Sequence, residues 1–280
     1  MYCPHCGKQQ EHDGMYCMFC GKSFTETDLT KREPRDKEKK TSKKHLGLKH
    51  PYVILSIIFL IGFSAQLYHL NSNYAEWIDS TIYLMKARSI AFGDDAINWR
   101  ADRAILMPVL LAFFMRLGAT DIVFKLVIIL WSSLSILLLY LIGKELFDEK
   151  IGLLAAFFYS TYYLAIFYGV RIMINALTVT FWLLGIYFFV RWRNSRKGLY
   201  WYLFCVMVPL NFMLYFQSVA LGIFIGVFLL LTERKFLLNK QFYFGICIVL
   251  ICMIPFFVYN QIAFGDTFAF LKKGIETNVF

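Results

Sequence analysis

The chain has 280 residues, of which 59% are hydrophobic and only 17% are charged. Its apolar residues are gathered in long blocks, and this composition excludes an ordinary soluble globular protein. A net charge of +10 is compatible with nucleic-acid binding, but nine of the 29 basic residues lie between positions 31 and 49, directly before the first apolar block. Such a segment is typical of a cytoplasmic flank that contacts anionic membrane lipid. No nucleic-acid partner is therefore expected.

Residues 1–24 contain two CxxCG motifs. Each motif places two thiolates on one side of a metal ion, and four thiolates complete the tetrahedral shell of Zn²⁺ without an open position. The segment therefore predicts a zinc ribbon with a structural zinc ion. Its expected ligands are Cys3, Cys6, Cys17 and Cys20. A segment this small depends on the metal for its stability.

The rest of the chain divides into a linker and a membrane domain. Residues 25–50 are charged and have no apolar period, which predicts a basic, flexible linker. Residues 51–280 are expected to form a transmembrane domain whose first outer loop covers residues 71–121. No segment that resembles a cleaved signal peptide precedes the first apolar block, so the N-terminus is expected to stay in the cytoplasm.

The membrane domain contains eight apolar runs, at 52–70, 104–117, 122–142, 151–170, 172–190, 199–214, 218–231 and 242–262. Basic loops at 191–197 and 234–240 are expected to be cytoplasmic. The membrane side of each loop can be counted backward from these basic loops or forward from the cytoplasmic N-terminus. The two counts give the same sides only if the short run 104–117, which contains Pro108, does not cross the bilayer. The prediction is an all-α multi-pass cell-membrane protein with about seven transmembrane helices and additional juxtamembrane helices in the first outer loop. Its N-terminus is cytoplasmic and its C-terminus lies outside.

The first outer loop concentrates charge in an otherwise apolar protein. Residues 71–103 contain five acidic and four basic residues, and charge gathered on one side of a membrane protein often marks its chemistry. Asp79, Tyr83 and Lys86 lie at helical spacing on one face. Gly93 is expected to end that helix.

Several motifs in chain order carry a family resemblance. Asp79 is followed four residues later by Tyr83, and Arg103 precedes an apolar run that contains Pro108. The segments LLLYLIGKELFDEKIGLLAA and IPFFVYNQIAFGDTF follow. Over residues 50–275 this order resembles the GT-C glycosyltransferases, in particular the branch of protein O-mannosyltransferases and aminoarabinose transferases.

The resemblance implies transfer of a sugar from a polyprenyl-phosphate donor to a protein or glycan acceptor on the outer face of the membrane. Asp79 matches the family's loop aspartate, which implies a general base or a ligand for a divalent cation. An alternative role for Asp79 is stabilisation of the first helical turn. Arg103 matches the family's arginine before the proline-containing run, and a guanidinium suits a lipid phosphate.

Other residues of the outer face are candidates with a second interpretation. Arg100 is an alternative to Arg103, and Arg171 either faces the phosphate or lies at the interface with its charge in water. Tyr83 and Asn175 are candidate substrate contacts, and Asn175 is also a candidate for a hydrogen bond between packed helices.

Two other classes of function remain open. A non-catalytic membrane anchor or assembly subunit would use the zinc ribbon to recruit a cytoplasmic protein, a partnership also expected for an enzyme. A transporter is less favoured, because the apolar runs contain very few charges. The chain has no Walker loop, GxSxG or HExxH motif, so nucleotide-binding and hydrolase functions lack support.

Overall fold

The computed structural model describes residues 20, 50–70, 77–95 and 99–277. The chain divides into two compact units, Met1–Gly47 and Leu48–Phe280. In the first unit only Cys20 is described, and it is exposed. The predicted zinc ligands Cys3, Cys6 and Cys17, and all of the predicted linker except its last residue, lie outside the described residues.

The described part of the second unit is helical and contains no strand. Its α-helices are α2 (Pro51–Tyr68), α3 (Ile78–Phe92), α4 (Leu106–Arg116), α5 (Asp121–Leu146), α6 (Glu149–Thr161), α7 (Tyr163–Gly169), α8 (Ile174–Ser195), α9 (Gly198–Leu214), α10 (Val219–Thr232), α11 (Lys240–Phe264) and α12 (Ala269–Thr277). Short 3₁₀ turns at Phe216–Ser218 and Arg234–Leu238 flank α10.

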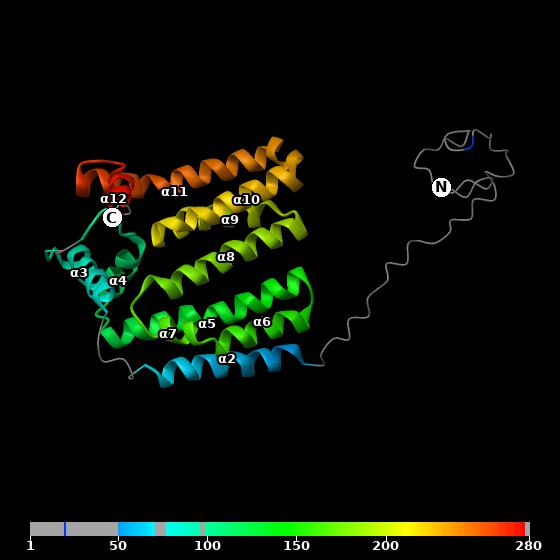
Figure 1. The fold of residues 1–280 in the computed structure, drawn as a ribbon, viewed down its shortest axis with the longest axis horizontal. Helices are drawn as coiled ribbons and strands as arrows, with labels where there is room; N and C mark the ends of the chain where they lie inside the picture. The colour runs from blue at the N-terminus through cyan, green and yellow to red at the C-terminus, as the bar shows by residue number, and fades with distance from the viewer. Residues whose placement is uncertain (1–19, 21–49, 71–76, 96–98, 278–280) are drawn as a thin grey trace. The chain divides into compact units, whose positions relative to one another are not determined.

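The long helices run alongside one another, whereas α3, α4 and α12 gather at one end of them (Figure 1). Helix α6 packs against α2 and α5. Helix α8 packs against α5 and α9, and α9 also packs against α11. Helix α3 packs on α4, and it ends at Gly93, which has a φ of 85°. The predicted helix stop at Gly93 is therefore confirmed.

The lengths of the helices support several membrane crossings. Helices α2, α5, α8 and α11 are each long and apolar enough to cross a bilayer, and α6 with α7 forms a fifth candidate that is bent by 60°. Helix α9 and the stretch Phe216–Thr232 are apolar but shorter, as is α4. The chain is therefore a multi-pass membrane protein, as predicted. Helix α4 has only 11 residues, about half of what a 30 Å hydrocarbon core requires.

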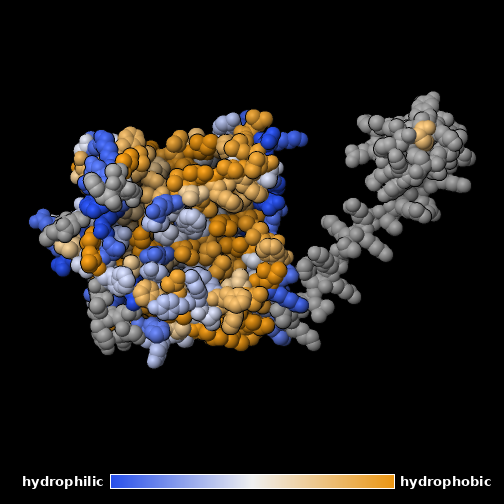
Figure 2. Space-filling model, viewed as in Figure 1, coloured by the Kyte–Doolittle hydropathy of each residue, from blue (hydrophilic) through white to orange (hydrophobic). Residues whose placement is uncertain are grey.

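Charged and apolar side chains are separated along the bundle. Figure 2 shows hydrophilic residues at both ends of the helices and a predominantly hydrophobic surface between them. Large apolar side chains such as Leu60, Leu231 and Ile251 are more than half exposed. Exposure of this apolar surface to water would be unfavourable, whereas the lipid chains of a bilayer would cover it. Inside the bundle, Ser135 and Thr180 join α5 to α8 by a hydrogen bond of 2.8 Å.

Ion pairs tie together the helix ends farthest from α3 and α4. Glu145 at the end of α5 accepts a hydrogen bond of 2.5 Å from Arg191 of α8, and Lys144 pairs with Glu149 at 2.7 Å. The Asp148 side chain accepts a hydrogen bond from the Ile151 amide and caps α6. These contacts hold the α5–α6 turn beside the end of α8.

Helices α5 and α6 approach each other closely through two glycines. A methyl group added at Gly143 would lie 2.6 Å from the Gly152 Cα, and one added at Gly152 would lie 2.5 Å from the Tyr140 carbonyl oxygen. Neither position has room for a side chain. Small residues of this kind allow helices to pack closely in a membrane, where the hydrophobic effect does not drive their association.

We therefore expect Gly152→Ala to destabilise the bundle. The added methyl group must move α6 away from α5, and overpacking of this kind costs about 1–3 kcal/mol. Gly226→Ala is the matched control, because a methyl group there has nothing within 4 Å. The measurement is the thermal unfolding midpoint in detergent. Equal midpoints for the two variants would contradict the close contact between α5 and α6.

Candidate functional site

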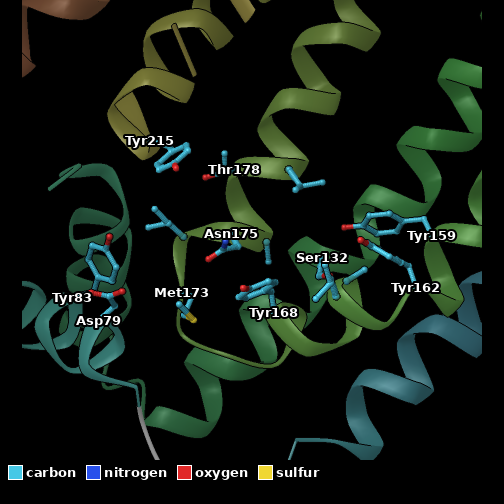
Figure 3. A pocket seen from close by; sticks show the side chains of 15 residues that line it. Asp79, Tyr83, Ser132, Tyr159, Tyr162, Tyr168, Met173, Asn175, Thr178 and Tyr215 are labelled. Atoms are coloured by element: carbon cyan, nitrogen blue, oxygen red, sulfur yellow. The ribbon is translucent and has the colours of Figure 1, made fainter. Parts of the chain in front are cut away.

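A cavity of about 500 Å³ lies between α3, α5, α6, α7 and the beginning of α8. In Figure 3, Asp79 and Tyr83 enter it from α3, while Ser132 and Tyr159 lie on the far side. Five tyrosines line it: Tyr83, Tyr159, Tyr162, Tyr168 and Tyr215. The cavity is large enough for a small molecule of sugar size.

The room for this cavity comes from the break between α6 and α7. Helix α6 ends at Thr161, Tyr162 is extended, and α7 begins at Tyr163. The hydroxyl groups of Ser160 and Thr161 donate to the Phe157 carbonyl in the last turn of α6, at 2.8 and 3.2 Å. Non-helical backbone at membrane depth is tolerated where it lines a cavity, and Tyr162 does line this one.

Asp79 and Arg103 form an ion pair at the α3 side of the cavity. Asp79 lies in the first turn of α3, and Arg103 lies in the segment just before α4. The Arg103 Nη1 donates to the Asp79 Oδ1 at 2.9 Å, and the two side chains are 22% and 49% exposed. The Arg103 Nε is buried and makes no hydrogen bond to a described residue. The bond to Asp79 uses one of the five N–H donors of the guanidinium group.

Tyr83 lies one helical turn after Asp79 and is buried. Burial raises the pKa of Tyr83 to about 12, against the opposing effect of the neighbouring Arg103. The phenol therefore stays neutral at physiological pH and can donate a hydrogen bond. Its ring packs edge-on against Trp99 at 6.3 Å between centroids, and Trp99 donates a hydrogen bond of 2.8 Å to the Tyr259 hydroxyl. These contacts fix the tyrosine on the cavity wall.

None of the three candidate arginines is among the residues that line the cavity. The guanidinium of Arg171 lies 3.5 Å from the ring centroid of Phe167 and 5.8 Å from that of Trp77. Arg100 donates to Asp102 at 2.9 Å. Burial acts to raise the pKa of Asp102, but the hydrogen bond and charge of Arg100 outweigh it and hold the pKa below its ordinary value. Only Arg103, among the three, is paired with the carboxylate of the cavity.

Asn175, in the first turn of α8, lines the cavity, as do several residues that the sequence analysis did not single out. The additional polar residues are Ser132, Tyr159, Tyr162, Tyr168, Thr178 and Tyr215. They fall within apolar runs or at their ends, and a polar residue in such a run is the signal that would have identified them. Among the residues that line the cavity, Asp79 is the single charged one.

Comparison with known proteins gives one decisive result. Residues 102–259, more than half of the chain, match the family model of dolichyl-phosphate-mannose-protein mannosyltransferase. The chain belongs to this family. Neither the curated proteins nor the solved structures contain a significant match. The predicted resemblance to membrane glycosyltransferases is confirmed at the level of the family.

The extent of the mannosyltransferase match bears on the site. It includes Arg103, the α6–α7 break and Asn175, but α3 with Asp79 precedes it. The roles of the individual residues therefore rest on the geometry of the cavity. That geometry places a carboxylate, a guanidinium and a neutral phenol side by side.

Proposed function

We propose that the protein transfers a sugar from a polyprenyl-phosphate donor to a hydroxyl group of a protein or glycan acceptor at the outer face of the membrane. The observation that carries this proposal is the Asp79–Arg103 pair beside a tyrosine-lined cavity in a chain of a mannosyltransferase family. One group can take a proton and the other can bind a phosphate. Glycosyl transfer from a lipid phosphate requires both.

In the proposed reaction the Asp79 carboxylate accepts the proton of the acceptor hydroxyl. The acceptor oxygen forms a bond to the anomeric carbon of the sugar, and the bond from that carbon to the phosphate oxygen breaks. The polyprenyl phosphate leaves with the bonding electron pair, and the guanidinium of Arg103 stabilises its negative charge. The neutral Tyr83 phenol lies beside both groups and can donate to a substrate oxygen.

A divalent cation at this site stays a prediction. Within the described residues no group of three His, Cys, Asp or Glu side chains gathers to hold a metal ion. Asp79 is the single carboxylate on the cavity wall, and Arg103 already occupies one of its oxygens. This donor set does not fit a protein-built site for a divalent cation, and the proposed reaction uses none.

The proposed topology has seven crossings. They are α2, α5, α6 with α7, α8, α9, Phe216–Thr232 and α11. Helix α8 ends in a basic turn that lies at the opposite end of the bundle from α3 and α4 (Figure 1). Since basic loops stay in the cytoplasm, this arrangement supports an outer location for Asp79 and for α12, and a cytoplasmic N-terminus.

The zinc ribbon would lie on the cytoplasmic side and take no part in the transfer. The four cysteines Cys3, Cys6, Cys17 and Cys20 form a donor set suited to Zn²⁺, and the proposed role of the ribbon is to dock a cytoplasmic protein. The alternative is that the whole protein is a non-catalytic membrane anchor that only binds this partner. The next experiment distinguishes this alternative from an enzyme.

We expect Asp79→Asn to abolish sugar transfer. Loss of a general base lowers the rate by about 10²- to 10⁴-fold, and the isosteric amide leaves the cavity in place. The measurement is transfer by the reconstituted protein from a mixture of radiolabelled polyprenyl-phosphate sugars to membrane acceptors. Asp94→Asn is the control, because Asp94 is half exposed, pairs with Arg88 and does not line the cavity. Transfer by Asp79→Asn at the unmodified rate would exclude the proposed base.

The zinc ribbon has a separate test. We expect about one zinc ion per chain by elemental analysis of the purified protein, and a loss of most of it in the double variant Cys3→Ser and Cys6→Ser. Deletion of residues 1–24 should leave transfer at the outer face intact. Absence of zinc from the unmodified protein would refute the metal site, and loss of transfer on deletion would refute the separation of the two parts.

A further inference from the structure

Helix α3, which contains Asp79 and Tyr83, packs on α4 at one end of the bundle, where α12 also lies (Figure 1). Asp79, Tyr83 and Lys86 are four and three residues apart, so they share one face of the helix. The rotation of α3 about its axis therefore decides where the carboxylate and the phenol point. A residue outside α3 that contacts this face can position both groups.

Trp99 and Tyr259 contact this face together. The Trp99 Nε1 donates to the Tyr259 hydroxyl oxygen at 2.8 Å. The ring of Trp99 lies edge-on to that of Tyr83, with 6.3 Å between centroids, and the Lys86 Nζ lies 5.7 Å from the ring centroids of both Trp99 and Tyr259. The pair thus meets α3 at two neighbouring positions of one face.

The bundle provides a firm base for this pair. Trp99 and Tyr259 both pack against a cluster of buried apolar side chains from the segment before α4, from α9, from α11 and from α12. The members of the cluster are Ile105, Met213, Phe256 and Phe270. The rings of Phe256 and Phe270 lie 5.1 Å apart between centroids. Tyr259 itself belongs to the last turns of α11, so its hydroxyl is presented from a long helix of the bundle.

The hydrogen bond is what fixes the indole. Trp99 lies outside any helix, so no helical backbone determines the direction of its side chain. An indole has one N–H donor and no acceptor, and the Tyr259 hydroxyl takes that donor. Phenylalanine at position 259 would keep the ring and its packing but would remove the acceptor. The indole could then rotate away from Tyr83.

The position of Trp99 matters to the site because of Tyr83. The Tyr83 side chain is only 6% exposed, and it lines the cavity beside Asp79. The packing of Trp99 against its ring keeps the phenol on the cavity wall. Displacement of the indole would give the Tyr83 ring room to move, and a shift of about 1 Å in a group that acts on a substrate can slow a reaction considerably.

We propose that Tyr259 is a positioning residue that, through its hydrogen bond to Trp99, holds the Tyr83 phenol in place beside Asp79 and Arg103. Tyr259 does not touch the substrate. This inference rests on the proposed function, in which Tyr83 donates to a substrate oxygen. It makes the end of α11, which lies far from α3 in the sequence, part of the support of the site.

The first test observes Tyr83 directly and needs no transfer. The protein is labelled with fluorinated tyrosine and studied in nanodiscs by fluorine NMR, where the Tyr83 signal is the one that Tyr83→Phe removes. We expect Tyr259→Phe to shift or broaden this signal, because the neighbouring indole is no longer fixed. Tyr243→Phe is the control, the same substitution in the same helix at a side chain that is 55% exposed. A Tyr83 signal that is unchanged in Tyr259→Phe, or changed equally in Tyr243→Phe, would overturn the proposal.

The second test is kinetic and measures sugar transfer by the reconstituted protein. Tyr259→Phe should lower kcat about five- to tenfold, as expected for one lost hydrogen bond that holds a group in place, and leave the KM for the donor within about twofold. In the Tyr83→Phe background the same change should lower kcat by less than about twofold, because the phenol that it positions is absent. A Tyr259 that only stabilised the fold would give the same loss in both backgrounds, and that result would overturn the proposal.

The two tests separate this inference from the proposed reaction. A protein without transfer, in which Tyr259→Phe still changes the Tyr83 signal and Tyr243→Phe does not, would reject the reaction and support the positioning of Tyr83. Transfer that depends on Asp79, together with a Tyr83 signal that does not respond to Tyr259→Phe, would support the reaction and reject the positioning role.

Discussion

The separation of charge from hydrocarbon is the constraint on which the rest of the structure depends. An ionised side chain in the apolar part of a bilayer is costly, and Figure 2 shows hydrophilic residues at both ends of the bundle with apolar surface between them. At one end, Glu145 and Arg191 join helix termini. At the other, Asp79 and Arg103 pair beside the cavity. Chemistry that needs a carboxylate and a cation can therefore take place only at an end of the bundle.

The same constraint explains where the cavity lies. A continuous α6 would satisfy all of its backbone groups and leave no space, whereas the 60° bend between α6 and α7 opens the wall formed by Tyr159, Tyr162 and Tyr168. Such a break is tolerated in a membrane where the non-helical backbone lines a cavity, as Tyr162 does here. The α6–α7 break thus connects the fold to the proposed binding of a sugar.

The helices were largely predictable and the cavity was not. The apolar runs 122–142 and 104–117 correspond to α5 and α4, because hydrophobic length is a local property of the sequence. The family resemblance singled out Asp79 and Arg103, and the structure brings them together. The hydrogen bond between Trp99 and Tyr259 and the gathering of Ser132, Tyr159 and Thr178 around one cavity depend on contacts between distant segments, which no local pattern in the sequence encodes.

The most direct test of this account is the side of the membrane on which α3 lies. Single cysteines replace Arg88, whose side chain is 64% exposed on α3, and Lys197, which is exposed in the α8–α9 turn. Intact cells are then treated with a membrane-impermeant maleimide, with the unmodified chain as background. The account predicts labelling of Arg88→Cys in intact cells and of Lys197→Cys only after permeabilisation. Labelling of both from the same side would contradict it.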